Sequence, residues 1–374
     1  MAYVFKKFET GSIAYDRRDF VSRPLWSGNN SELSKIYTSS AQSETQKLYY
    51  VDVYNTTGSR IEKQFSIAYC DFVNSGSSTG SSGIGNNVSE SKALYSQYKQ
   101  LLLEPETNLF EFVSKFDGLD SLGNTTVTYT ETSEHIYVLN INRTRYKEKL
   151  APGSWQLSLH GVDSDYGLPY ENRITTLVDE TIGELYLLGS SLSRTGPGGS
   201  FYYVYSGSLT DGLYSGNGSA TPYGIVYPDM GIIVLNGTAL DASASMNTKR
   251  NPATGSSSNN SLRLFNSISG AMEVSTDNSF KGRTLESINS TIYFARVGNG
   301  EFNFSNNVSY YQTGSEQYIK PLMLATQDKY RNITYVTTVG LYNDNKDLLA
   351  VAKLSKPVGK TSDSEMIIKI KLDY

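Results

Sequence analysis

Residues 332–354 read NITYVTTVGLYNDNKDLLAVAKL, and this stretch decides the fold class. Its first half is rich in β-branched and aromatic residues, which favour a half-buried strand. The next four residues, 343–346, read NDNK, and Asn and Asp side chains stabilise turns by bonding their own backbone. A second apolar run covers residues 347–354. The stretch therefore predicts a β-hairpin with strands at 332–342 and 347–354.

A last strand is predicted over residues 365–372. Ile368, Ile370 and Leu372 recur at every second position, while Lys369 and Lys371 fall between them. Side chains alternate between the two faces of a strand, so this pattern gives one apolar and one wet face. Such a strand completes its own sheet or adds to the sheet of a neighbouring chain.

Alternating or β-branched runs predict further strands, and one stretch predicts a helix. The helix covers about 91–104, with Ser91 as its cap and Pro105 closing it. Another hairpin is expected around the Gly-Asn-Gly turn at 298–300. The predicted strands are 47–54, 135–141, 155–159, 173–178, 184–188, 201–205, two segments of 224–235 separated at Pro228, and the hairpin strands 290–297 and 301–304.

Two stretches, 74–89 and 236–260, are rich in Ser, Gly and Asn and predict long loops. The first forty residues show no sustained period and predict an N-terminal arm, with Leu25 and Trp26 as an apolar docking anchor. We expect three parts: a loop-rich docking segment at 1–45, a mixed domain at 46–125 and a β-rich region at 126–374. The fold class is mainly β with minor α, in antiparallel, sandwich-like domains joined by long Ser/Gly/Asn loops.

Composition limits the classes of function. The 374 residues include 29 tyrosines against 14 phenylalanines, and tyrosine suits wet interfaces because its ring has a polar tip. A formal net charge of −4 argues against nucleic-acid binding, and the basic stretch 143–149 is interpreted as a solvated turn with apolar anchors. No window approaches 18 consecutive apolar residues, and residues 1–8 lack a secretory signal, so we expect no membrane span and synthesis in a cytosol.

Side chains that usually carry chemistry are few. The two histidines, His135 and His160, are interpreted as space-filling or hydrogen-bonded rings. Cys70 is the only cysteine and lies in an apolar stretch, so it is interpreted as a buried filler without a disulfide.

Several short motifs fall short of a site. Residues 76–80 match Gly-x-Ser-x-Gly but lie in a predicted loop. Residues 359–361 end like a phosphate-binding loop but lack its first glycine, and we expect a solvated turn there. Residues 163–167 begin like a calcium loop without its closing glutamate, and Asp117 with Asp120 is a carboxylate pair without supporting geometry. The sequence therefore predicts no catalytic, cofactor-binding or metal-binding residues and no enzymatic activity.

Seven segments, taken together and in order, resemble virion structural proteins of contractile-tailed phages (myoviruses), particularly those of cyanobacteria. The strongest are 334–344 and 348–357. The full set is LWSGN at 25–29, QFSIAY at 64–69, ALYSQY at 93–98, YKEKLAPGSW at 146–155, YGIVYPD at 223–229, TYVTTVGLYND at 334–344 and LLAVAKLSKP at 348–357.

The resemblance implies a tail or baseplate component without enzymatic activity, present in many copies in the virion and in the host cytoplasm before assembly. Its partners would be other virion proteins and copies of itself. A neck or head-to-tail connector, or a head-associated protein, remains an alternative. Our hypothesis places the assembly platform at the hairpin 334–354 and the last strand, so that deleting residues 366–374 abolishes incorporation.

Two functions of other classes stay open. A host-receptor protein that binds carbohydrate would use exposed aromatic side chains such as Tyr202 and Tyr203 near Gly-rich loops, although packing in a strand core explains these tyrosines more simply. A cell-wall or capsule depolymerase would need a positioned acid or base, which two histidines and dispersed acidic residues do not indicate.

Overall fold

The computed structural model describes residues 6, 14–38, 50–57, 60–73, 90–117, 126–162, 168–182, 194–214, 222–248, 250, 260–275, 279–305, 311–313, 319–321 and 333–374. It is mainly β, with 55% strand and 15% helix and with antiparallel sheets, which confirms the predicted fold class. The chain forms two compact units. Unit 2 comprises residues 20–287, and unit 1 combines residues 1–19 with 288–374. The sequence predicted three consecutive parts, at 1–45, 46–125 and 126–374. The two units divide the chain differently, because unit 1 combines residues 1–19 with 288–374.

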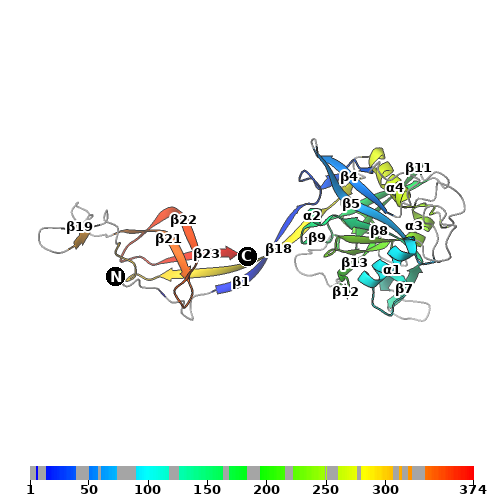
Figure 1. Cartoon of the computed structure of the whole chain (residues 1–374). Helices are drawn as coiled ribbons and strands as arrows, with labels where there is room; N and C mark the ends of the chain where they lie inside the picture. The colour runs from blue at the N-terminus through cyan, green and yellow to red at the C-terminus, as the bar shows by residue number, and fades with distance from the viewer. Residues whose placement is uncertain are drawn as a thin grey trace. The chain divides into compact units, whose positions relative to one another are not determined.

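One curled antiparallel sheet of eleven strands forms the framework of unit 2 (Figure 1). Two short strands, β12 (Arg194–Gly196) and β14 (Leu213–Tyr214), pair with β13 outside the main order. The main order is β2 (Glu32–Leu33), β17 (Phe280–Lys281), β10 (Gln156–Val162), β11 (Pro169–Asp179), β13 (Gly199–Ser208), β15 (Gly224–Tyr227), β16 (Ile232–Asn236), β8 (His135–Ile141), β5 (Arg60–Asp71), β4 (Tyr50–Thr57) and β3 (Tyr37–Thr38).

The central strands of this sheet are buried on both faces. In β8, Tyr137 and Leu139 belong to one apolar cluster, while Ile136 and Val138 belong to another. The first cluster includes side chains of the helices α3 (Gly237–Ser243) and α4 (Asn260–Val274). The second includes side chains of α1 (Glu90–Leu102) and of β6 (Phe110–Asp117), which pairs with β7 (Thr126–Ser133). Burial on two faces explains why these strands are continuously apolar.

The helix predicted at 91–104 is confirmed as α1, which ends three residues before Pro105. The predicted cap is wrong, because α1 already begins at Glu90 and Ser91 lies inside the helix. The predicted loop at 236–260 is wrong at both ends. Asn236 caps α3, since its Oδ1 accepts hydrogen bonds from the backbone N–H groups of Thr238 and Ala239. α4 begins at Asn260 and buries Leu264 and Ile268 against the sheet, so packing stabilises a helix whose start looks polar.

The loop-rich arm predicted at the N-terminus is also corrected. Residues 14–24 form a strand, β1 (Ala14–Pro24), that joins β18 (Arg283–Val297) in a sheet. The apolar anchor is real but packs within its own unit, because Leu25 and Trp26 are both buried. The Trp26 indole N–H donates a hydrogen bond to the Phe280 carbonyl at 2.7 Å.

Unit 1 is built on the pairing of β18 with β23 (Met366–Asp373), which runs from Ser290 opposite Asp373 to Val297 opposite Met366. Residues of β18 that belong to unit 2 pair with β9 (Lys149–Leu150). The predicted C-terminal hairpin is confirmed as β21 (Thr334–Tyr342) and β22 (Leu348–Lys360). A two-stranded sheet of β19 (Tyr311–Thr313) and β20 (Ile319–Pro321) also falls in this unit.

The hairpin predicted around 298–300 does not form. Residues 301–305 are not a strand, because the Glu301 carboxylate folds back to accept a hydrogen bond from the Gly298 N–H at 2.8 Å. Phe302 then takes a positive φ of 56°, which takes it out of the β region. The edge of β18 pairs with β23 instead.

Most other strand predictions are confirmed within a few residues, including the division of 224–235 around Pro228 into β15 and β16. The predicted strand at 184–188 and the loop at 74–89 lie outside the described residues, as do the motifs at 76–80 and 163–167 and the residue Asp120.

Candidate functional site

Both histidines are buried and bonded, as predicted. His160 lies in β10, and its Nδ1 is 2.8 Å from the Gly161 carbonyl. His135 begins β8, and its Nε2 is 3.2 Å from Oδ2 of Asp241 in α3. A Cβ on Gly237 would lie 2.2 Å from the His135 ring, so the helix start packs directly on the imidazole. The Asp241 carboxylate also accepts a hydrogen bond from the Thr248 N–H at 2.8 Å. His135 therefore ties α3 and the segment after it to the sheet.

Cys70 lies in β5 and is fully buried, which agrees with its predicted role as a small filler. Burial raises the pKa of its thiol well above the ordinary range. The thiol stays protonated at neutral pH, and a protonated buried thiol is a poor nucleophile.

A pair of buried carboxylates, Asp179 and Glu180, was not found from the sequence. Asp179 accepts hydrogen bonds from the N–H and hydroxyl of Thr181 and, at 3.0 and 2.9 Å, from the Gly153 N–H. Glu180 accepts bonds from the Tyr203 N–H and from Arg194, whose guanidinium lies 4.6 Å from the centre of the Tyr203 ring. Burial raises the pKa of both carboxyls. These bonds join the Pro-Gly turn at 152–153 and β12 to the sheet, which is a structural role.

Lys360 corrects another prediction. The sequence indicated a solvated turn at 359–361, yet Lys360 is fully buried at the end of β22. Its ammonium donates hydrogen bonds to the carbonyls of Asn299 and Thr361 and to Oδ1 of Asn303, at 3.0, 2.6 and 2.9 Å. An ammonium has three donors, so these acceptors satisfy it without a carboxylate. Lys360 fastens the open end of the hairpin to the loop after β18.

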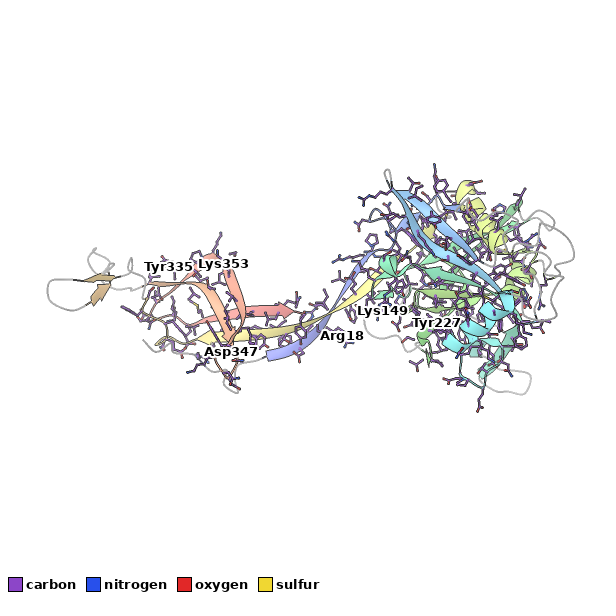
Figure 2. All side chains as sticks on the ribbon, in the orientation of Figure 1. Arg18, Lys149, Tyr227, Tyr335, Asp347 and Lys353 are labelled. Atoms are coloured by element: carbon purple, nitrogen blue, oxygen red, sulfur yellow. The ribbon has the colours of Figure 1, made fainter. Side chains whose placement is uncertain are left out.

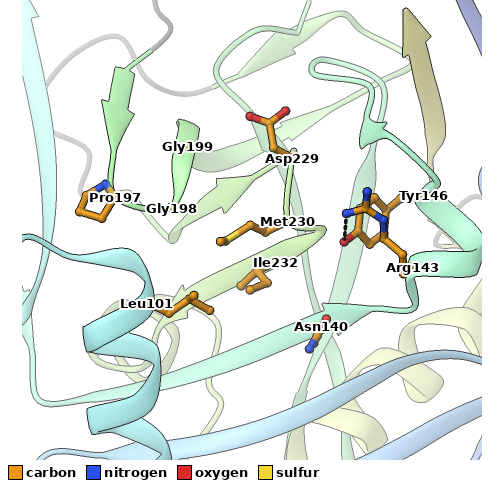
Figure 3. Close-up of a pocket in the computed structure, with 10 residues that line it drawn as sticks. All are labelled: Leu101, Asn140, Arg143, Tyr146, Pro197, Gly198, Gly199, Asp229, Met230 and Ile232. Carbon is orange, nitrogen blue, oxygen red and sulfur yellow. Dashed lines mark hydrogen bonds between the residues drawn. The ribbon is translucent and has the colours of Figure 1, made fainter.

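Unit 2 has a hollow of about 620 Å³. Figure 3 draws the residues that line it. Leu101, Met230 and Ile232 give it apolar walls, and Arg143 and Asp229 add charge. Tyr146, in α2 (Arg143–Tyr146), packs its ring directly on Gly231 next to this hollow, since a Cβ on Gly231 would lie 2.4 Å from the ring. Position 231 must therefore be glycine to make room for the Tyr146 ring. This close packing explains the glycine, so the glycine is no sign of a bound ligand.

Tests for two kinds of site gave no candidate. In the described ranges, no group of three or more His, Cys, Asp or Glu side chains is placed to hold a metal ion. No helix in the part of the chain that the structure describes is both long and apolar enough to cross a bilayer.

Apolar side chains point outward in unit 1. Four large apolar residues of its described part are buried: Ile292, Val297, Leu341 and Ile370. Eleven are exposed: Tyr15, Phe302, Phe304, Tyr335, Tyr342, Leu348, Leu349, Val351, Val358, Ile367 and Tyr374. In unit 2 the relation is reversed, since its buried apolar residues far outnumber the exposed ones. Large exposed apolar surfaces mark sites of interaction.

The hairpin β21–β22 contributes an exposed, partly apolar surface, which we call the outer face. Its cross-strand pairs are Tyr342 with Leu348, Gly340 with Val351, Thr338 with Lys353 and Val336 with Val358. Tyr342, Leu348, Val351 and Val358 are 46%, 53%, 58% and 43% exposed. The opposite face carries Leu341, which is buried, and Val339, which is half-buried.

Gly340 keeps the outer face flat. A Cβ at this position would lie 2.8 Å from Cε2 of Tyr342 and 3.3 Å from Cδ1 of Leu348, so both side chains lean over the glycine. The ring of Tyr342 therefore covers Gly340 while remaining 46% exposed. Figure 2 shows the side chains of the hairpin, with Tyr335 and Lys353 labelled.

Tyr202 and Tyr203, which a carbohydrate-binding surface would have used, are 8% and 6% exposed and lie on the two faces of β13. They pack in the two cores of unit 2, as the simpler interpretation predicted. Comparison with protein-family models, with curated proteins and with solved structures found no match to this chain. The candidate site is therefore the outer face of the hairpin.

Proposed function

We propose that this chain is a non-enzymatic structural component of a contractile-tailed phage particle, in its tail or baseplate, and that unit 1 docks it to its neighbours. The observation that carries the proposal is the outward-facing apolar surface of unit 1. The resemblance of its segments to virion proteins supports the same function. The chain would reside in the host cytoplasm before assembly and in the virion afterwards.

The described part of unit 1 has a small apolar core. Burying apolar surface stabilises a protein by about 25 cal/mol per Å², and four buried apolar side chains remove little such area from water. The eleven exposed ones would supply it once a partner covers them. Unit 1 would thus complete its core only on assembly. This property fits a particle component better than a free enzyme or a secreted binding protein.

Strand edges offer a second means of attachment. Within the described residues, β23 pairs with β18 along one edge and has no strand on its other edge. A neighbouring strand could add there through backbone hydrogen bonds. Ile367 is 67% exposed on this strand, while the neighbouring Ile370 is buried in unit 1.

The test is competitive incorporation of a Val351→Asp variant. Wild-type and variant chains are produced together during phage growth, and their ratio in purified particles is compared with their ratio in the cell. Val351 is exposed and makes no core contact in the free chain, so the variant should fold normally yet be depleted from particles at least tenfold. Equal incorporation would refute the outer face as the docking surface.

Ile61→Asp is the matched control, because Ile61 is 74% exposed on β5 of unit 2. It should enter particles as well as the wild type. The deletion of residues 366–374 is a less specific test, since it removes β23 and the buried Ile370 and so damages unit 1 itself. A cryo-EM map of the particle then distinguishes a tail or baseplate place from a neck or head-associated one.

A further inference from the structure

One charged side chain interrupts the apolar outer face. Lys353 pairs with Thr338, between the apolar pairs Gly340–Val351 and Val336–Val358. Its side chain is exposed, and no ion pair or hydrogen bond reaches it from the described residues. The position is central in the face.

The acidic residues of the hairpin do not neutralise Lys353. Asp344 and Asp347 both belong to the turn between the strands. Asp347 is held there by Asn343, which donates an amide hydrogen bond to its Oδ2 at 3.0 Å and accepts one from its N–H at 2.7 Å. Figure 2 labels Lys353 along β22 and Asp347 at the turn end of the same hairpin. The ammonium is thus available to an external carboxylate.

Covering the outer face would remove this ammonium from water along with its apolar neighbours. Burying a charge without a partner is strongly unfavourable, which would offset much of the gain from burying Val351 and Val358. A carboxylate on the covering surface removes that cost and adds charge-assisted hydrogen bonds. The outer face therefore selects for an apolar partner surface that carries an acidic side chain.

A second copy packed face to face does not meet this requirement. A two-fold contact centred on the outer face brings the two Lys353 ammonium groups into the same water-excluded region. Like charges held close together in such a region repel each other strongly. The charge pattern disfavours self-association through this face.

We infer that the outer face of β21–β22 binds a different virion protein, through an apolar surface with an Asp or Glu carboxylate opposite Lys353. The inference rests on the proposed function. It adds that the partner carries an acidic side chain within an apolar surface. Pairing of Lys353 with that carboxylate would also fix how the two surfaces align.

Competitive incorporation of Lys353→Met separates the two proposals. The methionine keeps an apolar stem and removes the charge. Against an acidic partner it leaves a carboxylate buried without its cation, so incorporation should fall about tenfold. Against a partner without a carboxylate it removes a desolvation cost, so incorporation should stay equal or rise, and that result would overturn the inference. Lys35→Met is the control, because Lys35 is also exposed but lies in unit 2 and belongs to neither the hairpin nor β23.

If Val351→Asp and Lys353→Met both enter particles normally, the docking surface itself is wrong. If Val351→Asp is excluded but Lys353→Met is not, the surface stands and its acidic partner is refuted.

A zero-length carbodiimide reagent, which joins an amine to a carboxylate in direct contact, gives an independent readout on purified particles. Mass spectrometry should find Lys353 joined to an Asp or Glu of a different protein. A link to another copy of this chain would refute the choice of partner. A Lys353 that stays as reactive toward acetylating reagents in the particle as in the free chain would refute the contact.

Discussion

Lys360 and Lys353 belong to the same strand and have opposite environments. The ammonium of Lys360 is buried against three oxygen acceptors, whereas that of Lys353 faces solvent. The two positions are seven residues apart, so strict alternation would place them on opposite faces. The bulge between Lys353 and Val358 changes the register of β22, and the loop at 299–303 then encloses its last residue.

Lys360→Met should destabilise unit 1 by about 1–3 kcal/mol, since it leaves buried carbonyl groups without donors. Urea unfolding followed by circular dichroism measures the change. Lys353→Met on the same strand is the matched control and should lie within about 0.5 kcal/mol of the wild type. Equal effects of the two substitutions would show that Lys360 is not held by its three acceptors.

Asp179 should give unit 2 an unusual pH dependence. Burial raises its pKa in the folded state above the ordinary value of 3.8, so the folded protein holds this proton to higher pH than the unfolded chain. Its contribution to the free energy of unfolding is therefore largest below pH 3.8 and decreases as pH rises through the raised pKa.

Asp179→Asn removes this titration. Urea unfolding at several pH values between about 3 and 7, monitored by tryptophan fluorescence, should show that the stability of the wild type relative to the variant falls as pH rises. A relative stability that increases with pH would mean that the hydrogen bonds to Asp179 outweigh its burial. Comparing one variant across pH cancels any fixed cost of the substitution.

Elements with one dominant pattern were predictable from the sequence, and elements stabilised by partners were not. The Asx-rich turn of β21–β22 and the alternation in β23 both appear locally, so strand and wet face were correct. α4 was missed because its first residues continue a Ser/Asn-rich stretch, although Leu264, Ile268 and Ala271 repeat with helical spacing. Residues 301–305 do not form the predicted strand, because the Glu301 carboxylate bonds the Gly298 N–H. No local sequence pattern indicates this hydrogen bond.

Ile268→Ala tests whether α4 is held by packing. Ile268 is fully buried in the first core of unit 2, so the truncation should cost about 2–5 kcal/mol. Val274→Ala in the same helix is the control, because Val274 is 61% exposed and should change stability by under about 0.5 kcal/mol. Thermal unfolding monitored by tryptophan fluorescence compares the two.

The candidate site was only partly predictable. The sequence pointed to the hairpin 334–354 as an assembly platform, and exposed apolar side chains were found there. Alternation of side chains along the two strands would have predicted one apolar face turned toward the core and one polar face turned toward solvent. The outer face instead carries Tyr342, Leu348 and Val351, and its character depends on which strands cover the hairpin in three dimensions.

At the scale of the whole molecule, the two units should unfold separately. Both tryptophans, Trp26 and Trp155, are buried in unit 2, so tryptophan fluorescence reports that unit alone. Unit 1 buries few apolar side chains and should unfold at lower denaturant concentration. Circular dichroism should therefore show loss of β structure before the fluorescence changes. Coincident transitions would mean that the units form one cooperative structure.

The interleaving of the two units also sets an order of events on the ribosome. Unit 2 is complete once residue 287 has left the exit tunnel, whereas unit 1 needs β1 from the start of the chain and β21, β22 and β23 from after that point. The outer face therefore comes into existence after the rest of the molecule has been made. A chain whose translation stops after residue 287 but before residue 334 contains all the residues of unit 2 but lacks the hairpin that carries the outer face. If the outer face docks the chain as proposed, such a truncated chain is not incorporated into particles.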